Sequence, residues 1–424
     1  MKMFHCTVIY LLLLYTCTPV YAFPEGADTL YLGTRTFITT QKTPNGTPVI
    51  HLWEAQRASE NQLDSVKFPQ LKGAQHFDVW KPVNRQEGVY NHFAALFFYN
   101  GLFYAMWGNH LYGENGPGQR VLFSTSKNGH EWAAPKELFP PPDSILPRGE
   151  VGVYLGPDRW VEVDGKLYAV VYVHKTNSSH SYPIVRELAK DGTFLGEPSL
   201  LSGLPKKAML PKFMSAPLRD PLLADKIDKW YIDNDAVSWW AYLEEKGIPA
   251  SGVDGTRLIE AFSFRSKEGV VVYMRDYNSQ TKISGRISSN RIFACFSDGQ
   301  GGWSAMYPTD IPDSHSRAQA VRLSDGSVLL VGNQIAPEFD KGLYLVRNPL
   351  TISFSPDGEF FTKVFALRSG DPDRVKHRFT GIPGNGPAGF GYPSMIIHND
   401  MIYVLYSINK EDIAITIVPL ASIF

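Results

Sequence analysis

The chain of 424 residues has very little cysteine. It contains only Cys6, Cys17 and Cys295, and the first two lie in a segment that we expect to be removed. One remaining cysteine excludes an internal disulfide framework, so a hydrophobic core must hold the fold together. Cys295 lies in the apolar run RIFACFSD. This context predicts a buried, unreactive thiol rather than a nucleophile or a metal ligand.

An excess of charge of either sign is also missing. Lys and Arg total 41 residues, and Asp and Glu total 42. No global positive field is available for nucleic acid, so a polyanion would have to be bound by a local cluster of Arg, Lys and His. After the N-terminus, no apolar run is long enough for a transmembrane helix. We therefore expect a monomer that binds neither nucleic acid nor a membrane.

The N-terminal segment Met1–Ala22 has the features of a signal peptide. Lys2 precedes the apolar run Val8–Tyr15, and Val20-Tyr21-Ala22 offers a small residue at the expected cut. The apolar run is too short to span a bilayer, and the residues before Cys17 fit a lipoprotein cleavage box poorly. We expect secretion to the extracellular space or the periplasm, with residues 23–424 as one mature domain.

A hairpin unit recurs along that domain. Alternating apolar strands flank two-residue turns whose residues tolerate positive φ, as tight hairpins require. The turns are Asn100-Gly101, Asp164-Gly165, Glu268-Gly269, Asp325-Gly326 and Asn399-Asp400. The wide gap between the second and third turns leaves room for a less regular copy near Lys229–Asp235. This period predicts an all-β fold, a β-propeller of four-stranded blades, with seven blades and six as the alternative.

A second repeat is a turn motif. STSKNGHEW (Ser124–Trp132), SDGQGGW (Ser297–Trp303) and SPDGEFF (Ser355–Phe361) resemble the Asp-box of sialidase-type propellers. In such a turn a Ser or Asp side chain accepts backbone N–H groups, and glycine takes the left-handed conformation. The motif supports the fold, and says nothing of catalysis because these turns lie at the blade periphery.

Two histidines stand at the open end of the first hairpin. His92, next to Asn91, begins one strand, and His110, next to Asn109, follows the end of the other. Because the hairpin folds at Asn100-Gly101, both imidazoles belong at the same mouth of the propeller. Each histidine can also simply bind a carbonyl or organise a loop.

The segment YNHFAALFFYNGLFYAMWGNHLYGENGPGQRV resembles the β-propeller ulvan lyases and the related gum-arabic rhamnosidases. IPDSHSRAQAVRLSDGSVLLVGN and GYPSMIIHNDMIYVLYSINKEDIAIT also resemble that group. The resemblance implies that His92 and Arg186 neutralise a uronate carboxylate. It implies that His110 and Tyr172, with Tyr168 as the alternative tyrosine, exchange the protons. Asn91, Asn109 and Arg275 would contact substrate, although Arg275 is equally well explained by a salt bridge.

These residue types suit β-elimination. A lyase removes the C5 proton of a uronate and expels the sugar at C4. Arginine can hold the carboxylate in a bidentate pair, while histidine and tyrosine can carry the proton. We therefore predict a secreted polysaccharide lyase, a carbon–oxygen lyase that cleaves uronate-containing, ulvan-like sulfated polysaccharide.

Two alternatives remain open. One is a glycoside hydrolase of the same fold, either a rhamnosidase or a sialidase-like enzyme. Sialidases need an arginine triad, a Tyr-Glu nucleophile pair and an acidic proton donor, and the Phe/Tyr-Arg-Ile-Pro segment of their first arginine is not visible here. The other is a non-catalytic carbohydrate-binding propeller. We expect no catalytic cofactor and no catalytic metal, although Asp371 and Asp373 could hold a structural calcium ion.

Overall fold

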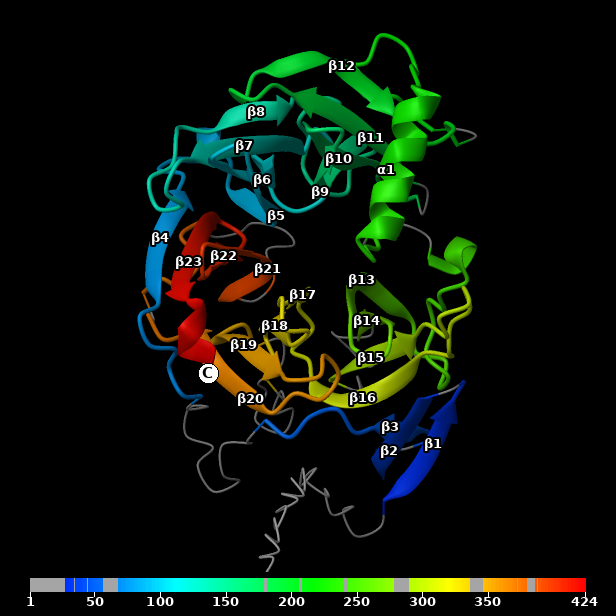
Figure 1. Ribbon diagram of the computed structural model, residues 1–424. Coiled ribbons are helices and arrows are strands. Elements are labelled where there is room, and N and C mark those ends of the chain that lie inside the picture. The colour runs from blue at the N-terminus through cyan, green and yellow to red at the C-terminus, as the bar shows by residue number, and fades with distance from the viewer. Residues whose placement is uncertain are drawn as a thin grey trace, which may run out of the picture.

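A computed structural model describes residues 27–33, 35–43, 45–55, 68–178, 181–205, 208–238, 243–277, 290–335, 346–371, 373–379, 386 and 388–424. Within these ranges the strands form five sheets that stand around a common axis (Figure 1). The fold is the predicted all-β propeller of four-stranded blades. The expected signal peptide, residues 1–22, lies outside the described part of the chain.

Four blades are built from consecutive strands. The first contains β5 (Tyr90–Tyr99), β6 (Leu102–His110), β7 (Arg120–Ser126) and β8 (Lys136–Phe139). The second contains β9 (Val153–Val163), β10 (Lys166–Lys175), β11 (Ser181–Leu188) and β12 (Phe194–Leu200). The third contains β13 (Leu258–Arg265), β14 (Val270–Asp276), β15 (Arg291–Phe296) and β16 (Tyr307–Pro312). The fourth contains β17 (Gln319–Arg322), β18 (Val328–Gly332), β19 (Leu350–Ser355) and β20 (Lys363–Arg368).

The fifth blade closes the ring with strands from both ends of the chain. It contains β21 (Phe390–His398), β22 (Met401–Ile408), β23 (Asp412–Pro419) and the early strand β4 (Gln75–Trp80), which pairs antiparallel with β23. Three more early strands extend the third blade, where β3 pairs parallel with β16. They are β1 (Asp28–Leu32), β2 (Arg35–Lys42) and β3 (Pro48–Ile50).

Each predicted hairpin joins the first two strands of one blade, so all five are confirmed. In three of the turns both residues take the left-handed conformation that the sequence anticipated, whereas at Glu268-Gly269 and Asp325-Gly326 only the glycine has positive φ. Asn100 has φ +48° and Asp164 φ +50°, each followed by a glycine with positive φ. Because the innermost strand comes first in every blade, these hairpins also fix which strands line the axis.

The predicted blade number is not observed. Five blades are found in the described ranges, against the expected seven or six. The five recognised hairpins already mark every blade in these ranges. The proposed copy near Lys229–Asp235 is wrong because this segment belongs to helix α1 (Pro221–Asp233).

Helix α1 fills the space between the second and third blades. Asp220 caps its N-terminus by accepting hydrogen bonds from the N–H groups of Leu222 and Leu223, and Pro221 is the first helical residue. Ile227 and Tyr231 pack on the second blade. Single-turn 3-10 helices cover Arg85–Glu87, Leu243–Lys246 and Leu420–Ile423. In the described part of the chain no helix is long and apolar enough to cross a membrane.

The Asp-box turns join the third and fourth strands of three blades. In the first, Ser126 accepts the Gly129 N–H at 2.8 Å and Asn128 accepts the Glu131 N–H at 2.9 Å. In the last, Asp357 accepts the N–H groups of Glu359 and Phe360. These turns organise the blade periphery, as predicted. Cys295 is buried too, and burial raises the pKa of its thiol to about 12, consistent with an unreactive side chain.

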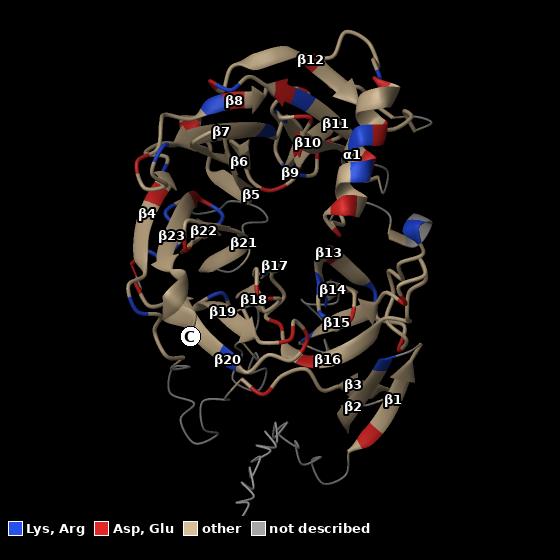
Figure 2. Ribbon diagram, viewed as in Figure 1, with Lys and Arg blue, Asp and Glu red and all other residues tan. Residues whose placement is uncertain are grey.

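The inner strands run in the same direction around the axis. At the start of β5 and β21, His92 contacts Tyr392, and at their ends Phe98 contacts His398. The ring therefore has a first mouth, where the inner strands begin, and a second mouth, where they end. Both signs of charge are spread around the ring (Figure 2), so any charge cluster at a mouth is local.

Candidate functional site

Three inner strands carry the same irregularity at the first mouth. In β5, β13 and β21 two residues face one residue of the neighbouring strand, which makes a β-bulge. The first bulge residue is Phe93, Glu260 or Tyr392, with φ of +59°, +58° and +58°. A left-handed conformation is unfavourable for these bulky residues and marks a constrained, often functional position.

Two of the bulge residues form a pair across the axis. Tyr392 Oη donates a hydrogen bond of 2.6 Å to Glu260 Oε1, although the two residues are 132 positions apart. Burial raises the pKa of the Tyr392 phenol above its usual value, and the positive charge of Arg275 only partly offsets this effect. The phenol therefore keeps its proton at neutral pH, with a carboxylate positioned to accept it.

Arginines surround this pair. Arg275 Nε lies 2.7 Å from Glu260 Oε2 in an ion pair, and Arg275 also donates to the His315 carbonyl. The guanidinium carbons of Arg275 and Arg347 lie 5.9 and 5.3 Å from the centre of the Tyr392 ring. Burial is the largest single effect and disfavours the charged form of Arg275, but Glu260, Tyr392 and the other nearby acidic groups together outweigh it and raise the pKa of Arg275. Arg317, within electrostatic range of Glu260 and Tyr392, has a pKa lowered to about 10 by burial.

His92 completes the group that we call the Tyr392 cluster: Tyr392, Glu260, Arg275, Arg317, Arg347 and His92. Its ring centre lies 4.0 Å from that of Tyr392, and its Nδ1 lies 2.6 Å from Ser407 Oγ. The Ser407 hydroxyl donates to the Gly391 carbonyl, which assigns the His92 proton to Nδ1. His92 Nε2 is buried and has no hydrogen-bond partner among the described residues. Burial and nearby cations lower the pKa of His92, so it is neutral at pH 7.

Two further carboxyl groups lie within electrostatic range of Arg275: Asp313 and Glu114. Asp313 is almost fully buried, and burial raises its pKa to about 7. Its Oδ2 has no hydrogen-bond partner among the described residues. Glu114 accepts from Lys410 Nζ at 2.7 Å and from Tyr90 Oη at 3.2 Å. Asp313 is therefore the carboxyl that can hold a proton near neutral pH.

His110, predicted as a proton carrier, organises a loop instead. Its Nδ1 lies 2.8 Å from the Gly113 carbonyl oxygen and its Nε2 lies 3.0 Å from that of Pro117. An added Cβ at Gly116 would lie 2.4 Å from the ring, so the glycine-rich loop covers the imidazole closely. Both ring nitrogens are occupied within the protein.

The asparagines predicted to contact substrate form a buried network. Asn91 donates to the carbonyls of Gly88 and Glu411, and its oxygen accepts from Asn109 Nδ2 at 2.8 Å. Asn109 also accepts from Arg120 Nε. These hydrogen bonds of the side-chain amides connect the first blade to the fifth and hold the two blades together.

Tyr172 and Arg186 lie elsewhere. Tyr172 packs beside Ile227 and Tyr231 of α1. Arg186, on the third strand of its blade, donates to the Leu138 carbonyl and covers the Phe194 ring at 4.1 Å. Tyr168, the alternative tyrosine, donates to Glu187. Among the described residues, no hydrogen bond or ring contact joins any two of His92, His110, Tyr172 and Arg186.

Of the predicted site residues, only His92 and Arg275 belong to the Tyr392 cluster. Sequence reasoning missed Tyr392, Glu260, Arg317, Arg347, Asp313 and Glu114. A usable signal was present for Tyr392, which lies seven residues before the first turn residue of its hairpin, Asn399, as the bulge residue Phe93 lies seven residues before Asn100. When the hairpins are superimposed at their turns, residues at this position fall at the same mouth of the ring.

Histidine, cysteine and carboxylate side chains are the usual protein ligands of metal ions. In the part of the chain that the structure describes, no group of three or more His, Cys, Asp or Glu side chains is arranged to hold a metal ion. Asp371, proposed for calcium, accepts the Arg374 N–H, and Asp373 pairs with Lys376. These contacts are those of a charged surface turn.

Comparisons with known proteins support the fold. Residues 231–404 match a family model described as a BNR repeat-like domain, and residues 60–150 match the BT_1020-like, N-terminal beta propeller model. A solved structure titled sialidase aligns over 83% of this chain with 20% identity and a TM-score of 0.59. This chain spans 33% of the length of that protein. At this identity the alignment establishes a sialidase-like propeller fold and nothing finer.

Two other solved structures align less well. A glycosyl hydrolase from Bacteroides ovatus shows 12% identity over 83% of this chain and 93% of its own, with a TM-score of 0.40. A Trypanosoma rangeli sialidase in complex with sialic acid shows 13% identity over 94% and 59%, with a TM-score of 0.38. We base no argument on these two alignments. No curated protein matches the sequence.

Proposed function

We propose that this propeller is a glycoside hydrolase that acts on an acidic sugar, with Tyr392 as the nucleophile. The observation that carries the proposal is the 2.6 Å hydrogen bond from Tyr392 to Glu260, enclosed by arginines. Most glycosidases use two carboxylates, and sialidases with a tyrosine nucleophile are an exception to that rule. The sialidase-like fold is consistent with the proposal.

Each group has a definite task in this mechanism. Glu260 Oε1 takes the phenolic proton as Tyr392 Oη attacks the anomeric carbon, and the bond to the leaving sugar oxygen breaks. Water then attacks the anomeric carbon and gives one proton to Asp313, which has lost its own to the leaving sugar oxygen. The bond from that carbon to Tyr392 Oη breaks, and the phenolate regains its proton from Glu260. Because the phenol is neutral before attack, it does not repel a substrate carboxylate as an Asp or Glu nucleophile would.

Arg275 and Arg347 supply the preference for an acidic sugar. Guanidinium groups bind carboxylates in bidentate fashion, and both lie within 6 Å of the centre of the nucleophile's ring. A carboxylate held by them would lie close to the carbon under attack. We therefore favour a sugar whose carboxylate is attached at or beside the anomeric carbon, as in 2-keto-3-deoxy sugar acids.

Asp313 is our proposed proton donor to the leaving group. Its pKa, raised to about 7 by burial, keeps a proton available near neutral pH. Glu114 is the weaker choice because its two oxygens already accept from Lys410 and Tyr90.

β-Elimination from a uronate is a second candidate. The observation that favours it is the buried Nε2 of His92 beside Tyr392, for which the described part of the chain offers no hydrogen-bond partner, since a neutral imidazole is a suitable base. In that reaction Arg275 would neutralise the carboxylate, His92 would take the C5 proton and Tyr392 would protonate the leaving oxygen. His110, Tyr172 and Arg186 would have no part.

One experiment separates these reactions. Purified protein is incubated with aryl glycosides of a 2-keto-3-deoxy sugar acid, of a uronate and of rhamnose, and with ulvan. Release of the aryl alcohol without new ultraviolet absorbance, lost in Tyr392→Phe, supports hydrolysis. Rising absorbance from a C4–C5 double bond conjugated to the carboxylate would instead establish a lyase. Binding without any product would indicate a non-catalytic propeller.

A further inference from the structure

A cavity opens toward the opposite mouth of the ring and is lined by both apolar and charged side chains. Its volume is about 590 Å³, which is within the range of small-molecule sites. It is lined by the later residues of the inner strands, such as Phe97 and Ile397, whereas His92 and Tyr392 stand at their beginnings. Ser394 and Arg317 also line it, and Arg317 belongs to the Tyr392 cluster, so the cavity adjoins that cluster and extends from it toward the second mouth.

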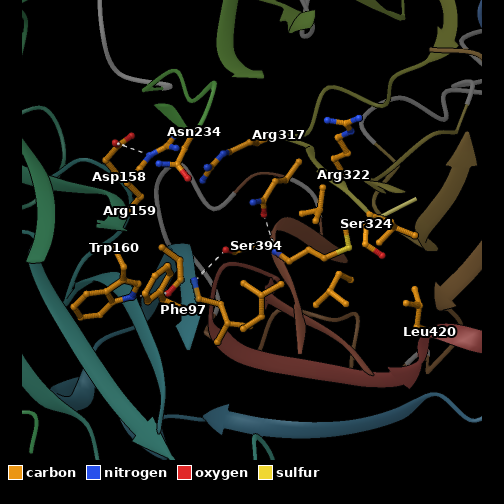
Figure 3. A pocket seen from close by; sticks show the side chains of 18 of the residues that line it. Phe97, Asp158, Arg159, Trp160, Asn234, Arg317, Arg322, Ser324, Ser394 and Leu420 are labelled. Carbon is orange, nitrogen blue, oxygen red and sulfur yellow. Dashed lines mark hydrogen bonds and ion pairs between the residues drawn. The ribbon is translucent and has the colours of Figure 1, made fainter. Parts of the chain in front are cut away.

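The side chains that line the cavity include more positive than negative groups. Arg159, Arg317 and Arg322 line it, together with Asp158 and Asp400. Figure 3 shows Arg159, Asn234 and Arg317 grouped at one end of the cavity, with Arg322 and Ser324 on the other side. Guanidinium groups on two sides of a cavity are suited to an anion.

The carboxylates in the cavity do not neutralise all of its arginines. Asp158 is occupied, because it accepts from Tyr231, from Ser238 Oγ at 2.9 Å and from Arg159 Nε at 3.3 Å. Arg317 lies close enough to Arg159 for their charges to repel, and burial with this repulsion lowers its pKa. Arg322 is exposed and has no hydrogen bond or ion pair among the described residues. An anionic ligand would relieve the repulsion and engage the free guanidinium.

The remaining lining fits a sugar. Phe97 and Trp230 are half-buried aromatic side chains that can cover the C–H face of a pyranose. Ser324 and Asn234 add hydroxyl and amide groups for sugar hydroxyls. Aromatic surfaces beside arginines and small polar groups are the chemistry that recognises an acidic saccharide.

We propose that the part of the cavity toward the second mouth binds a carboxylate-bearing saccharide, anchored by Arg322 and by Arg317, which it shares with the Tyr392 cluster. Binding there needs no reaction at Tyr392, and Arg322 and Ser324 lie outside the cluster, so variants at these two residues test this site apart from the hydrolase proposal.

The test is calorimetric titration with D-glucuronate, with D-glucose as the neutral probe. We compare the wild type with Arg322→Glu, which reverses one charge, and Ser324→Trp, which fills the entrance with an indole. Arg219→Glu, at an exposed arginine outside the cavity, is the matched control. Arg347→Gln serves as a background that weakens binding at the first mouth.

We expect glucuronate, and not glucose, to bind in the Arg347→Gln background. Arg322→Glu should weaken that binding at least about tenfold, since it replaces a charge-assisted contact with a repulsive one. Ser324→Trp should abolish it and Arg219→Glu should leave it unchanged, while all three variants keep the wild-type thermal unfolding. Absence of glucuronate binding in folded Arg347→Gln, or binding insensitive to both Arg322→Glu and Ser324→Trp, would overturn the proposal.

Discussion

At the scale of single residues, the central feature is a tyrosine whose chemistry is set by its neighbours. Tyr392 is strained, buried and hydrogen-bonded to Glu260. Tyr392→Phe removes only the hydroxyl, so we expect the fold to persist and kcat to fall by at least about 10³-fold, as for the loss of other nucleophiles. Steady-state kinetics with circular dichroism as the folding control would check this. Retained activity in Tyr392→Phe would exclude the hydroxyl as nucleophile.

Asp313 gives a prediction about leaving groups and pH. Asp313→Asn should slow a substrate with a poor leaving group by about 10²- to 10⁴-fold, because protonation assists departure. A nitrophenolate leaving group needs little assistance and should be nearly unaffected. Glu114→Gln is the comparator. If Glu114→Gln shows the leaving-group dependence and Asp313→Asn does not, the assignment to Asp313 is wrong.

The wild-type rate on the poor leaving group should fall as the pH rises through about 7, because Asp313 then loses its proton. The same raised pKa has a consequence for stability. Folded Asp313 holds a proton that the unfolded chain loses near pH 4, so its contribution to stability is complete below that value and is lost as the pH rises through about 7. Asp313→Asn should remove both dependences in pH–rate and pH–unfolding profiles.

His110 tests the difference between a structural and a catalytic histidine. Both of its ring nitrogens meet backbone carbonyls of one loop. His110→Ala should therefore cost about 1–3 kcal/mol in the free energy of unfolding, as buried polar groups lose their partners. It should change kcat much less than Tyr392→Phe does. Denaturant titration beside kinetics separates the two, and a stable but inactive His110→Ala would restore the sequence-based role.

At the scale of the element, two turn glycines with positive φ differ in the space around them. Gly358 (φ +88°) lies in an Asp-box turn, and an added Cβ would come within 2.9 Å of the Ser266 backbone on the neighbouring blade. Gly299 (φ +75°) lies in another Asp-box turn with open space around it. Gly358→Ala should destabilise the protein by more than the roughly 1–2 kcal/mol of conformational strain expected for Gly299→Ala. Equal losses in chemical unfolding would show that the contact between blades carries no energy.

The hairpins were predictable because turn chemistry is local. Asn100-Gly101 and the other predicted two-residue turns indicate positive φ and antiparallel pairing of the strands beside them. The bulges were not, because nothing in the neighbourhood of Glu260 or Tyr392 specifies two residues facing one. Their pairing depends on blades that meet only after the ring has closed. The contacts of His110 were not predictable either, since its partners are backbone carbonyls of the next loop, which have no sequence signature.

At the scale of the whole molecule, the ring is closed by β4 pairing with β23. A chain that begins at Lys81 lacks this strand and leaves the edge of β23 without its partner. We expect it to unfold at a lower temperature and over a broader range than a chain that begins at Phe68, which keeps β4 and serves as the control for loss of the first three strands. Scanning calorimetry would show this. Identical transitions in the two chains would mean that β4 does not hold the ring closed.

The whole-molecule prediction of fold class is confirmed, whereas the predicted blade number is not found in the described residues. Repeating hairpins specify a propeller, but the number of blades depends on how much chain the connections use. Here α1 and its flanking loops occupy the place where another blade was expected. Arg275 and Glu260 illustrate the same limit for the site, because their alignment with Tyr392 is a property of the closed ring rather than of any segment.

The most direct test of the account is to trap the intermediate. The protein is treated with a fluorinated glycosyl fluoride of a 2-keto-3-deoxy sugar acid, in which the fluorine beside the anomeric carbon slows hydrolysis of a covalent adduct, and is then digested and mapped by mass spectrometry. We predict one glycosyl group, attached to Tyr392 and absent from Tyr392→Phe and Glu260→Gln. An adduct on a different residue, or turnover of the parent sugar with no adduct at Tyr392, would contradict the proposed nucleophile.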